Sequence, residues 1–356
     1  MPTFDSFDAI DDLRVSRTEA LTPPVDVLRS MPNTPAVSRL VRETRAAVGR
    51  VLRGEDPRLL VVVGPCSIHD TAGAMEYAQW VLEASRALAD RLLVIMRVYF
   101  EKPRTRGGWK GLINDPALDG SFRINEGLRL ARGLLLDING LGLPTATEFV
   151  DLITPQYISD LISWAAVGAR TTESQVHREL ASGLSMPVGF KNGTTGDVKI
   201  AINALVAASN PHHFLGVTKS GSAAIVATRG NHDCHLILRG GVRPNYDEYS
   251  IDSAVAALVH EGVCPRVMID CSHGNCGGDY RRQLVVAQEI TRQLAAGSPH
   301  VCGVMVESHL TAGSQRWDAG QPRLPTQSIT DPCIGIADTT TLLSALAERR
   351  ISTYAC

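Results

Sequence analysis

Short apolar runs rich in β-branched residues alternate along the chain with longer stretches of helical composition, such as TAGAMEYAQWVLEASRALAD and DVKIAINALVAAS. This alternation is typical of a parallel sheet whose strands are joined by crossover helices. Eight runs qualify as strands, and they cover residues 59–64, 92–98, 144–149, 165–170, 187–192, 235–240, 266–273 and 302–308. Eight strands with intervening helices predict an α/β fold, a closed (β/α)8 TIM barrel, with an open doubly wound sheet as the alternative.

Two segments do not fit the alternation. Residues 1–50 precede the first strand and are interpreted as an N-terminal extension. The apolar runs at 213–218 and 223–230 are separated by a few residues that include Gly221, which predicts a β-hairpin inserted over about residues 212–230. We therefore expect a single barrel domain over residues 51–356 that carries these two additions.

Composition excludes several classes of protein. The chain has 356 residues, 44% of them hydrophobic, so it can bury a sizeable core and intrinsic disorder is excluded. A net charge of −2 argues against a nucleic-acid binder. No apolar run approaches the roughly 18 residues of a membrane helix. The acidic start MPTFDSFDAIDD lacks the apolar stretch of a secretory signal, so we expect a cytoplasmic protein.

Each predicted strand delivers a polar or ionisable residue at or just past its carboxyl end, where barrel enzymes carry their catalytic groups. These residues are Cys66, Arg97, Glu148, Arg170, Lys191, Arg239, His273 and Glu307. A charge at the end of a buried strand costs several kcal/mol unless it is paired or meets a ligand. The general polarity of loops can explain any one of these residues, but it does not readily explain all eight of them together.

Six of the candidate residues are cations that the barrel would bring to one mouth: Arg97, Lys102, Arg104, Arg170, Lys191 and Arg239. Arginine matches phosphate and carboxylate oxygens with two parallel hydrogen bonds, and lysine adds a compact charge. The set therefore indicates a site for more than one anionic group. The alternative is an internal salt-bridge network with Glu101, Glu148 and Asp331.

A second set contains Cys66, His273, Glu307 and Asp331. A thiolate, an imidazole and carboxylates suit one divalent ion such as Mn²⁺, Fe²⁺, Co²⁺ or Zn²⁺. No two of these residues share a short ligand spacing, so the pattern alone supports a metal weakly. Two readings stay open, because Cys66 can be a small buried apolar residue and His273 a general base. The nearby polar alternatives are His69, Cys276 and His309.

The motifs that carry these residues closely resemble the type I class of 3-deoxy-D-arabino-heptulosonate 7-phosphate (DAHP) synthases from about residue 11 to 345. They are GPCSIHD, MRVYFEKPRTRGGWKGLINDP, GARTTESQVHRE, PVGFKNGT, HLILRGG, MIDCSHGN, GVMVESHL and SITDPCIG. The resemblance implies a metal-dependent condensation of phosphoenolpyruvate with D-erythrose 4-phosphate and water, which gives DAHP and phosphate. This reaction opens the shikimate pathway to the aromatic amino acids.

The resemblance also implies roles for individual residues. It implies that the metal ligands are Cys66, His273, Glu307 and Asp331. It implies that phosphoenolpyruvate meets Arg97, Lys102, Arg170, Lys191 and Arg239, and that the aldose phosphate meets Arg104 and Thr105. Lys102 is our candidate for donating a proton to the forming hydroxyl, because neighbouring guanidinium groups are expected to lower its pKa. A purely electrostatic Lys102 is the alternative.

Family members that respond to an aromatic amino acid bind it between the N-terminal extension and the inserted hairpin. The matching residues here are Asp11, Asp12, Asp151, Pro155, Gln156, Ser185, Phe214, Gly216 and Val226. Gly216 is similar to tyrosine-sensitive members, so tyrosine is the favoured effector, with phenylalanine and tryptophan as alternatives. The extension could instead only cover a sheet edge. The resemblance further implies a homodimer or homotetramer.

Two rival functions stay open. The sister enzyme that condenses phosphoenolpyruvate with arabinose 5-phosphate shares the barrel and the chemistry, although FEKPRTRGGWKG matches the four-carbon aldose class. A non-catalytic sensor of aromatic amino acids is the rival from another class, and the intact set of candidate catalytic residues argues against it.

Overall fold

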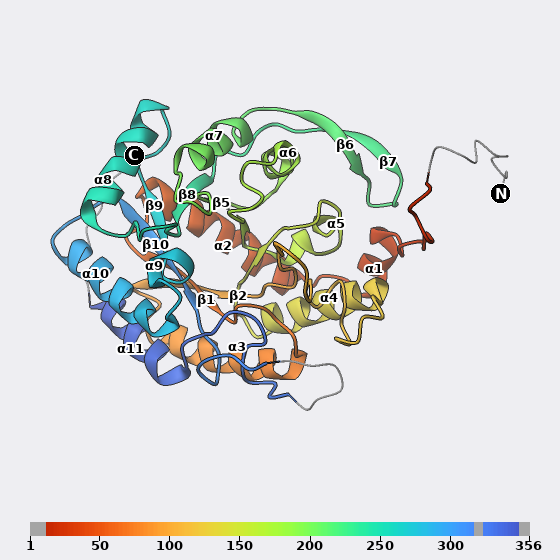
Figure 1. Cartoon of the computed structure of the whole chain (residues 1–356), viewed down its shortest axis with the longest axis horizontal. Helices are drawn as coiled ribbons and strands as arrows, with labels where there is room; N and C mark the ends of the chain where they lie inside the picture. The colour runs from red at the N-terminus through yellow and green to blue at the C-terminus, as the bar shows by residue number, and fades with distance from the viewer. Residues whose placement is uncertain (1–11, 317–322, 349–356) are drawn as a thin grey trace.

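The structure, a computed structural model, describes residues 12–316 and 323–348. Eight parallel strands pair in the order β1-β10-β9-β8-β5-β4-β3-β2 and close into a barrel (Figure 1). They are β1 (Leu59–Gly64), β2 (Leu92–Arg97), β3 (Thr145–Glu148), β4 (Trp164–Val167), β5 (Val188–Lys191), β8 (Cys234–Leu238), β9 (Val267–Asp270) and β10 (Val301–Glu307). The predicted (β/α)8 barrel is confirmed, because the sheet closes where a doubly wound sheet would stay open. Each strand begins within one residue of its predicted start.

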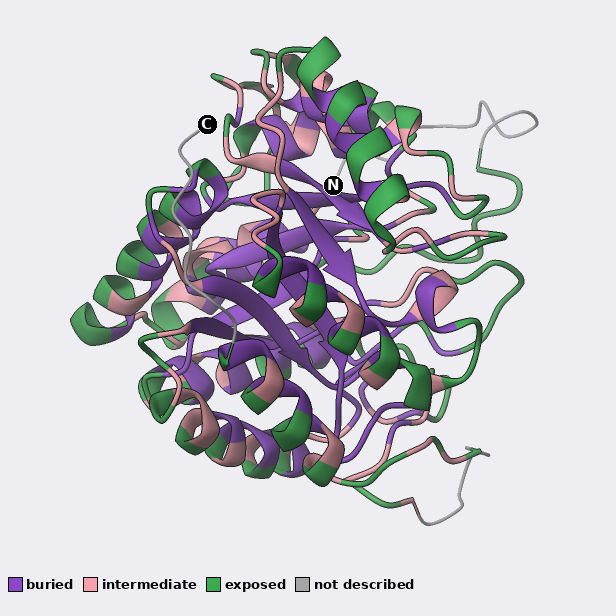
Figure 2. Cartoon of the chain, turned by 90° about the vertical axis from the view of Figure 1, so that its left-hand side faces the viewer, coloured by how far each residue is buried: buried purple, intermediate pink, exposed green. Residues whose placement is uncertain are grey.

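Helices surround the barrel, and the longer ones bury one face against it, so that the strands are enclosed (Figure 2). They are α3 (Thr71–Arg86), α4 (Ile124–Gly140), α5 (Pro155–Ile158), η1 (Ser159–Leu161), α6 (Gln175–Gly183), α7 (Lys199–Ala208), α8 (Glu248–His260), α9 (His273–Cys276), η2 (Tyr280–Arg282), α10 (Gln283–Ala295) and α11 (Ile336–Ala347). None of the helices in the described ranges combines the length and the apolar character that crossing a membrane requires.

The barrel interior has its own apolar core, separate from the layer between strands and helices. Along β1, Leu60 and Val62 belong to the interior cluster, whereas Leu59 and Val61 pack in the outer layer. This alternation follows from the two-residue period of a strand. Both faces of a barrel strand are buried, which is why the predicted runs are almost continuously apolar.

Helix α2 (Pro35–Arg53) closes one end of this interior. Thr34 caps its N-terminus by accepting a hydrogen bond from the Val37 amide, and Gly54 ends it with a left-handed φ of 76°. Four residues of its second half join the interior cluster, which also contains Leu60 and Cys302 near the starts of β1 and β10: Ala47, Val48, Val51 and Leu52. The helix therefore plugs the end of the barrel opposite the strands' carboxyl ends, and the division at residue 50/51 falls inside it.

The predicted hairpin is present as β6 (His213–Val217) and β7 (Ala223–Ala227), an antiparallel pair outside the barrel sheet. In Figure 1 it arches from α7 toward α1 (Pro24–Ser30). The Val25 amide donates to the Lys219 carbonyl in the hairpin turn over 2.7 Å. The described part of the N-terminal segment and the hairpin thus contact each other.

Candidate active site

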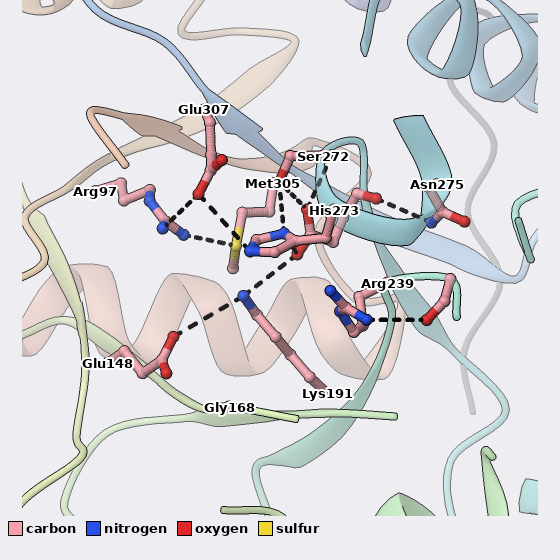
Figure 3. Close-up of polar contacts among 12 residues, drawn as sticks. Arg97, Glu148, Gly168, Lys191, Arg239, Ser272, His273, Asn275, Met305 and Glu307 are labelled. Atoms are coloured by element: carbon pink, nitrogen blue, oxygen red, sulfur yellow. Dashed lines mark hydrogen bonds and ion pairs between the residues drawn. The ribbon is translucent and has the colours of Figure 1, made fainter. Parts of the chain in front are cut away.

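Five strands bring charged side chains to one mouth of the barrel. Arg97, Glu148, Lys191, Asp270 and Glu307 are the last residues of β2, β3, β5, β9 and β10, and all five are buried. Figure 3 shows Arg97, Glu148, Lys191 and Glu307 pointing toward a common centre. In a parallel barrel the carboxyl ends of all strands meet on the same face, so residues far apart in sequence share one site.

Three of the four predicted metal ligands form one group in the described ranges. The ligand atoms of Cys66, Glu307 and Asp331 all lie within 4.8 Å of one another. The fourth, His273, borders this group, since its Nε2 lies 3.9 Å from Glu307 Oε1. A thiol, two carboxylates and an imidazole form the mixed donor set that suits Mn²⁺, Fe²⁺, Co²⁺ or Zn²⁺. The residues present therefore fit a single divalent ion.

Arg97 is the fully buried partner of Glu307. One guanidinium nitrogen lies 2.8 Å from Glu307 Oε1 and 3.1 Å from the Cys66 carbonyl, and Nε donates to the Pro65 carbonyl over 3.1 Å. The guanidinium carbon lies 3.5 Å from the centre of the Tyr99 ring. These contacts satisfy a charge that would otherwise be costly to bury. Arg97 therefore fixes the carboxylate and the backbone beside the candidate metal group.

Lys102 reaches the same group from the loop after β2. Its Nζ lies 3.0 Å from Cys66 Sγ and 3.2 Å from the Cys66 carbonyl. Burial opposes the charged ammonium, but the charges of Cys66 and Glu307 outweigh burial and raise the pKa of Lys102. The expectation that guanidinium groups lower this pKa is wrong, because the lowering by Arg97 is smaller. Burial raises the pKa of the Cys66 thiol to about 11, whereas a bound divalent cation favours the thiolate.

Asp270 lies between His273 and Lys191. Its Oδ2 is 2.9 Å from His273 Nδ1 and 3.3 Å from Lys191 Nζ, and Lys191 Nζ is also 3.9 Å from Glu148 Oε2. Burial opposes ionisation of Asp270, but His273 and Lys191 outweigh it and hold the pKa of this carboxyl well below its usual range. The sequence analysis missed Asp270, although an acid that ends an apolar strand three residues before His273 was a usable signal.

Two predicted substrate cations lie at the exposed rim. Arg170 donates from Nε to Thr105 Oγ1 over 2.9 Å, and Arg104 donates from Nε to the Trp109 carbonyl over 2.8 Å. Both arginines are exposed. The structure therefore separates a buried level of the mouth, with Arg97 and Lys191, from an outer level in the loops.

Arg239 directly follows the last residue of β8 and is positioned by hydrogen bonds of its amide and its guanidinium group. Its amide donates to Asn192 Oδ1 over 2.8 Å, and its guanidinium contacts the Gly240 carbonyl at 3.4 Å. Gly240 has a φ of 71°, and a Cβ there would lie 2.5 Å from the Asn275 amide. Only glycine suits this close approach of two loops. Asn192 and Asn275 are further positioning residues that the sequence analysis missed.

The salt-bridge alternative accounts for part of the cation set. Of the six candidate cations, two form ion pairs with carboxylates within the described ranges: Arg97 with Glu307, and Lys191 with Glu148 and Asp270. The remaining four cations are Lys102, Arg104, Arg170 and Arg239. Their charges are available to an anionic ligand.

Glu101, a member of the alternative network, pairs instead with neutral groups. Its Oε1 accepts hydrogen bonds from the Asp151 amide and from Thr154 Oγ1. Burial, assisted by the nearby Asp151 charge, raises the pKa of Glu101 to about 8. A carboxyl with a raised folded-state pKa binds its proton more tightly in the folded protein, so its contribution to stability is present below about pH 4.5 and is lost as pH rises to about 8.

Glu101→Gln removes this pH-dependent loss of stability. Between pH 5 and pH 8 the variant is therefore expected to gain stability relative to the wild type. The expected gain is about 3 kcal/mol in the free energy of unfolding, since each pH unit between the two pKa values is worth about 1.4 kcal/mol. Denaturant unfolding at the two pH values measures it. Glu83→Gln, at an exposed position on α3, is the control. An equal difference in both variants would contradict the prediction.

Seven of the nine predicted effector residues line one cavity of about 920 Å³ between α5, α6 and the hairpin. They are Asp151, Pro155, Gln156, Ser185, Phe214, Gly216 and Val226. Lys219 also lines it and donates to the Gln156 carbonyl. Asp12 is not among the lining residues, and Asp11 lies outside the described residues.

The other polar candidates lie beside the candidate metal group and not within it. His69 and His309 contact each other with ring centres 6.2 Å apart, and burial lowers the pKa of His309 to about 4. Cys276 Sγ lies 3.3 Å from the His273 carbonyl. Within the described ranges, none of these three joins the group of Cys66, Glu307 and Asp331.

The fold and the site together define a (β/α)8-barrel enzyme that combines a candidate metal group with anion-binding cations at one mouth. Residues 34–344 match the family model described as the DAHP synthetase I family. The chain belongs to this family, and it is a transferase. The resemblance inferred from the motifs is thereby confirmed.

Related proteins cover nearly the whole chain. The Phe-sensitive phospho-2-dehydro-3-deoxyheptonate aldolase of Escherichia coli K12 is 55% identical over 338 residues, which are 95% of this chain and 97% of that protein. The Trp-sensitive protein of Shigella flexneri is 51% identical over 95% of this chain and 97% of its own length. The structure of the aldolase from Francisella tularensis SCHU S4 has a TM-score of 0.92 at 50% identity, covering 94% of this chain and 98% of that chain.

Proposed function

We propose that this enzyme condenses phosphoenolpyruvate with D-erythrose 4-phosphate and water to give DAHP and inorganic phosphate, the entry step of the shikimate pathway. One observation carries the proposal: two groups of side chains lie at the same barrel mouth. The first fits a divalent ion, and the second consists of four cations that form no ion pair with a carboxylate within the described ranges. Two phosphates and a carboxylate bring about four to five negative charges at pH 7, which this arrangement can offset.

The side chains divide between the two substrates. Arg97 and Lys191 in the buried level bind phosphoenolpyruvate, together with Lys102, Arg239 and, from the rim, Arg170, while Arg104 and Thr105 hold the aldose phosphate at the rim. Cys66, His273, Glu307 and Asp331 would hold the metal. A bound divalent ion supplies Lewis-acid polarisation of the aldehyde oxygen. C3 of phosphoenolpyruvate forms a bond to the aldehyde carbon, water adds at C2, and phosphate leaves with cleavage of its bond to C2. Holding two repelling anions together is a large part of the catalysis.

Phosphate release measured with each aldose tests the proposal. We expect turnover with erythrose 4-phosphate that exceeds turnover with arabinose 5-phosphate by about a hundredfold or more, because the motif FEKPRTRGGWKG matches the four-carbon aldose class. Preference for arabinose 5-phosphate would favour the sister enzyme. No release with either aldose, under each of Mn²⁺, Fe²⁺, Co²⁺ and Zn²⁺, would favour the non-catalytic sensor.

We also propose that Lys102 donates the proton that the forming hydroxyl needs. Its support is the position of Nζ, which lies 3.0 Å from Cys66 Sγ at the group that fits a divalent ion. Lys102→Arg keeps the charge but is a far weaker acid, so turnover is expected to fall about a hundredfold. Steady-state kinetics should show the loss in kcat with a smaller change in KM for phosphoenolpyruvate. Near-normal turnover with an unchanged pH–rate profile would leave Lys102 a purely electrostatic role.

The cavity beside the hairpin is proposed to bind an aromatic amino acid that inhibits the enzyme. Its support is a volume suited to such a ligand, a carboxylate at Asp151 for the ammonium group, and apolar walls that include Phe214 and Val226. The E. coli and Shigella relatives carry names that mark them as Phe- or Trp-sensitive. Tyrosine is the effector favoured here, because Gly216 is similar to the tyrosine-sensitive members of the family.

Inhibition assays with tyrosine, phenylalanine and tryptophan test this choice. Gly216→Ser is expected to weaken inhibition by tyrosine about tenfold, since a Cβ at this position would lie 2.7 Å from Val226 Cγ2. Ala227→Ser, at an exposed position of the same hairpin, is the matched control. Stronger inhibition of the wild type by phenylalanine or tryptophan would contradict the choice of tyrosine.

We propose that the enzyme is a homo-oligomer, a dimer or a tetramer. Leu215 and Ile225 pair across the hairpin and are 88% and 78% exposed, an apolar face that association would cover. Light scattering at assay concentrations measures the mass, and a monomer would contradict the proposal.

A further inference from the structure

Asp270 accepts hydrogen bonds at one carboxylate oxygen and has ion-pair neighbours at the other. Oδ1 accepts hydrogen bonds from the Ser272 amide over 3.0 Å and from Ser272 Oγ over 2.7 Å. Oδ2 lies 2.9 Å from His273 Nδ1 and 3.3 Å from Lys191 Nζ. The side chain is fully buried, so no solvent competes for these contacts. One carboxylate oxygen therefore contacts a candidate metal ligand on one side and a candidate substrate cation on the other.

The contacts determine which ring nitrogen of His273 carries a proton. Ser272 Oγ lies 2.6 Å from His273 Nδ1. The single hydroxyl proton of Ser272 is used toward Asp270, because an ionised carboxylate can only accept. Ser272 Oγ must then accept from His273, which places the proton on Nδ1, on the side of Asp270 Oδ2. The lone pair of Nε2 is left on the side of Glu307.

The backbone of His273 depends on the same contacts. Its φ is 56°, a left-handed conformation that costs a non-glycine residue free energy unless its surroundings hold it. Gly274 packs against the Gly240–Gly241 backbone so closely that a Cβ would lie 2.6 Å from the Gly241 amide. The loop is thus clamped on one side by backbone packing and on the other by Asp270.

Asp270 also forms an ion pair with Lys191. The Lys191 side chain is 3% exposed, and its two carboxylate neighbours are Asp270 at 3.3 Å and Glu148 at 3.9 Å. The shorter contact is the one that can fix the ammonium position. Figure 3 shows Lys191 reaching toward His273 across the centre of the mouth.

We propose that Asp270 is a positioning residue that joins the two halves of the site, holding His273 in the tautomer that can ligate a divalent metal and holding Lys191 where it meets the anionic substrate. The inference rests on the proposed function for the identity of the substrate. The tautomer does not depend on that function. Outer-shell partners of this kind change metal affinity by about 10–100-fold when they are lost.

Asp270→Asn tests the coupling. An amide keeps the size of the carboxylate but must direct an N–H toward one donor group, either at Ser272 or at the His273–Lys191 side. Titration of the full-length, metal-free protein with Mn²⁺ alone is expected to show an affinity about 10–100-fold weaker than wild type. Titration with phosphoenolpyruvate, without aldose, is expected to show weaker binding by about tenfold.

Glu148→Gln is the matched control, since Glu148 contacts Lys191 and, within the described ranges, forms no hydrogen bond or ion pair with His273. It is expected to weaken phosphoenolpyruvate binding while Mn²⁺ affinity stays within about threefold of wild type. If Asp270→Asn leaves either affinity unchanged, or if Glu148→Gln lowers both, the coupling is refuted. Failure of the proposed function would appear separately, as an absence of phosphate release in the wild type.

The tautomer can be measured without a variant of Asp270. Nitrogen NMR of the ¹⁵N-histidine-labelled, metal-free protein is expected to show His273 protonated at Nδ1 and unprotonated at Nε2. Loss of the signal in His273→Gln assigns it. A proton on Nε2 would overturn the proposal even if Asp270→Asn failed to fold.

Discussion

Removal of divalent metal is expected to abolish turnover, and Mn²⁺ is expected to restore it. The donor set at Cys66, His273, Glu307 and Asp331 fits such an ion, and polarisation of a carbonyl oxygen is worth several kcal/mol. About 4 kcal/mol corresponds to about a thousandfold in rate. Phosphate release after exhaustive chelation, and again after stepwise addition of each metal, measures the effect.

Two cysteine variants distinguish the loss of a metal ligand from a general loss of stability. Cys66→Ser is expected to weaken Mn²⁺ binding by more than the roughly 10–100-fold that loss of an outer-shell partner costs. Cys302→Ala removes an equally buried thiol near the start of β10, where it packs in the barrel interior, and is expected to leave Mn²⁺ binding intact. Full activity of the chelated wild type, or equal Mn²⁺ affinity in both variants, would contradict metal dependence.

Arg97→Met is expected to lower the free energy of unfolding of the metal-free protein by about 3–5 kcal/mol, because the Glu307 carboxylate then lies buried without its counter-charge. Added Mn²⁺ supplies another positive charge to the same carboxylate, so part of the loss should return on metal binding. Turnover is expected to fall by about a thousandfold, since Arg97 is also one of the proposed ligands of phosphoenolpyruvate. Denaturant unfolding with and without Mn²⁺ measures the first effect.

Arg132 provides the matched control for Arg97. It is equally buried and forms two hydrogen bonds to Asp160 at 2.7 and 2.9 Å, far from the mouth of the barrel. Arg132→Met is expected to destabilise the protein without any rescue by Mn²⁺. Equal rescue of both variants, or none of either, would show that Arg97 does not neutralise the candidate metal group.

The barrel could be predicted from the sequence because its strands are buried on both faces and read as continuous apolar runs. The cations at the mouth could be predicted for the same reason, since Arg97 and Lys191 interrupt such runs at their ends. Spacing along the chain also indicated the hairpin, where Gly221 separates two apolar segments. These features depend on local pattern, which one sequence displays.

The features that the sequence analysis missed depend on which strands closure of the barrel brings together. Asp270 meets Lys191 only because β9 and β5 are brought to one mouth by closure of the sheet. The pKa of Lys102 was predicted in the wrong direction because the negative groups beside it, Cys66 and Glu307, come from two other strand ends. Likewise, the place of Asp12 outside the cavity lining follows from the path of the chain, which composition does not determine.

Helix α2 has a consequence for any shortened form of this protein. A fragment beginning at residue 51 would lack most of helix α2, which covers Leu60 and its neighbours at that end of the barrel. We therefore expect a fragment that begins at residue 51 to be less stable than the full chain. A truncation from Thr34 onward would keep the whole of helix α2, including its N-terminal cap.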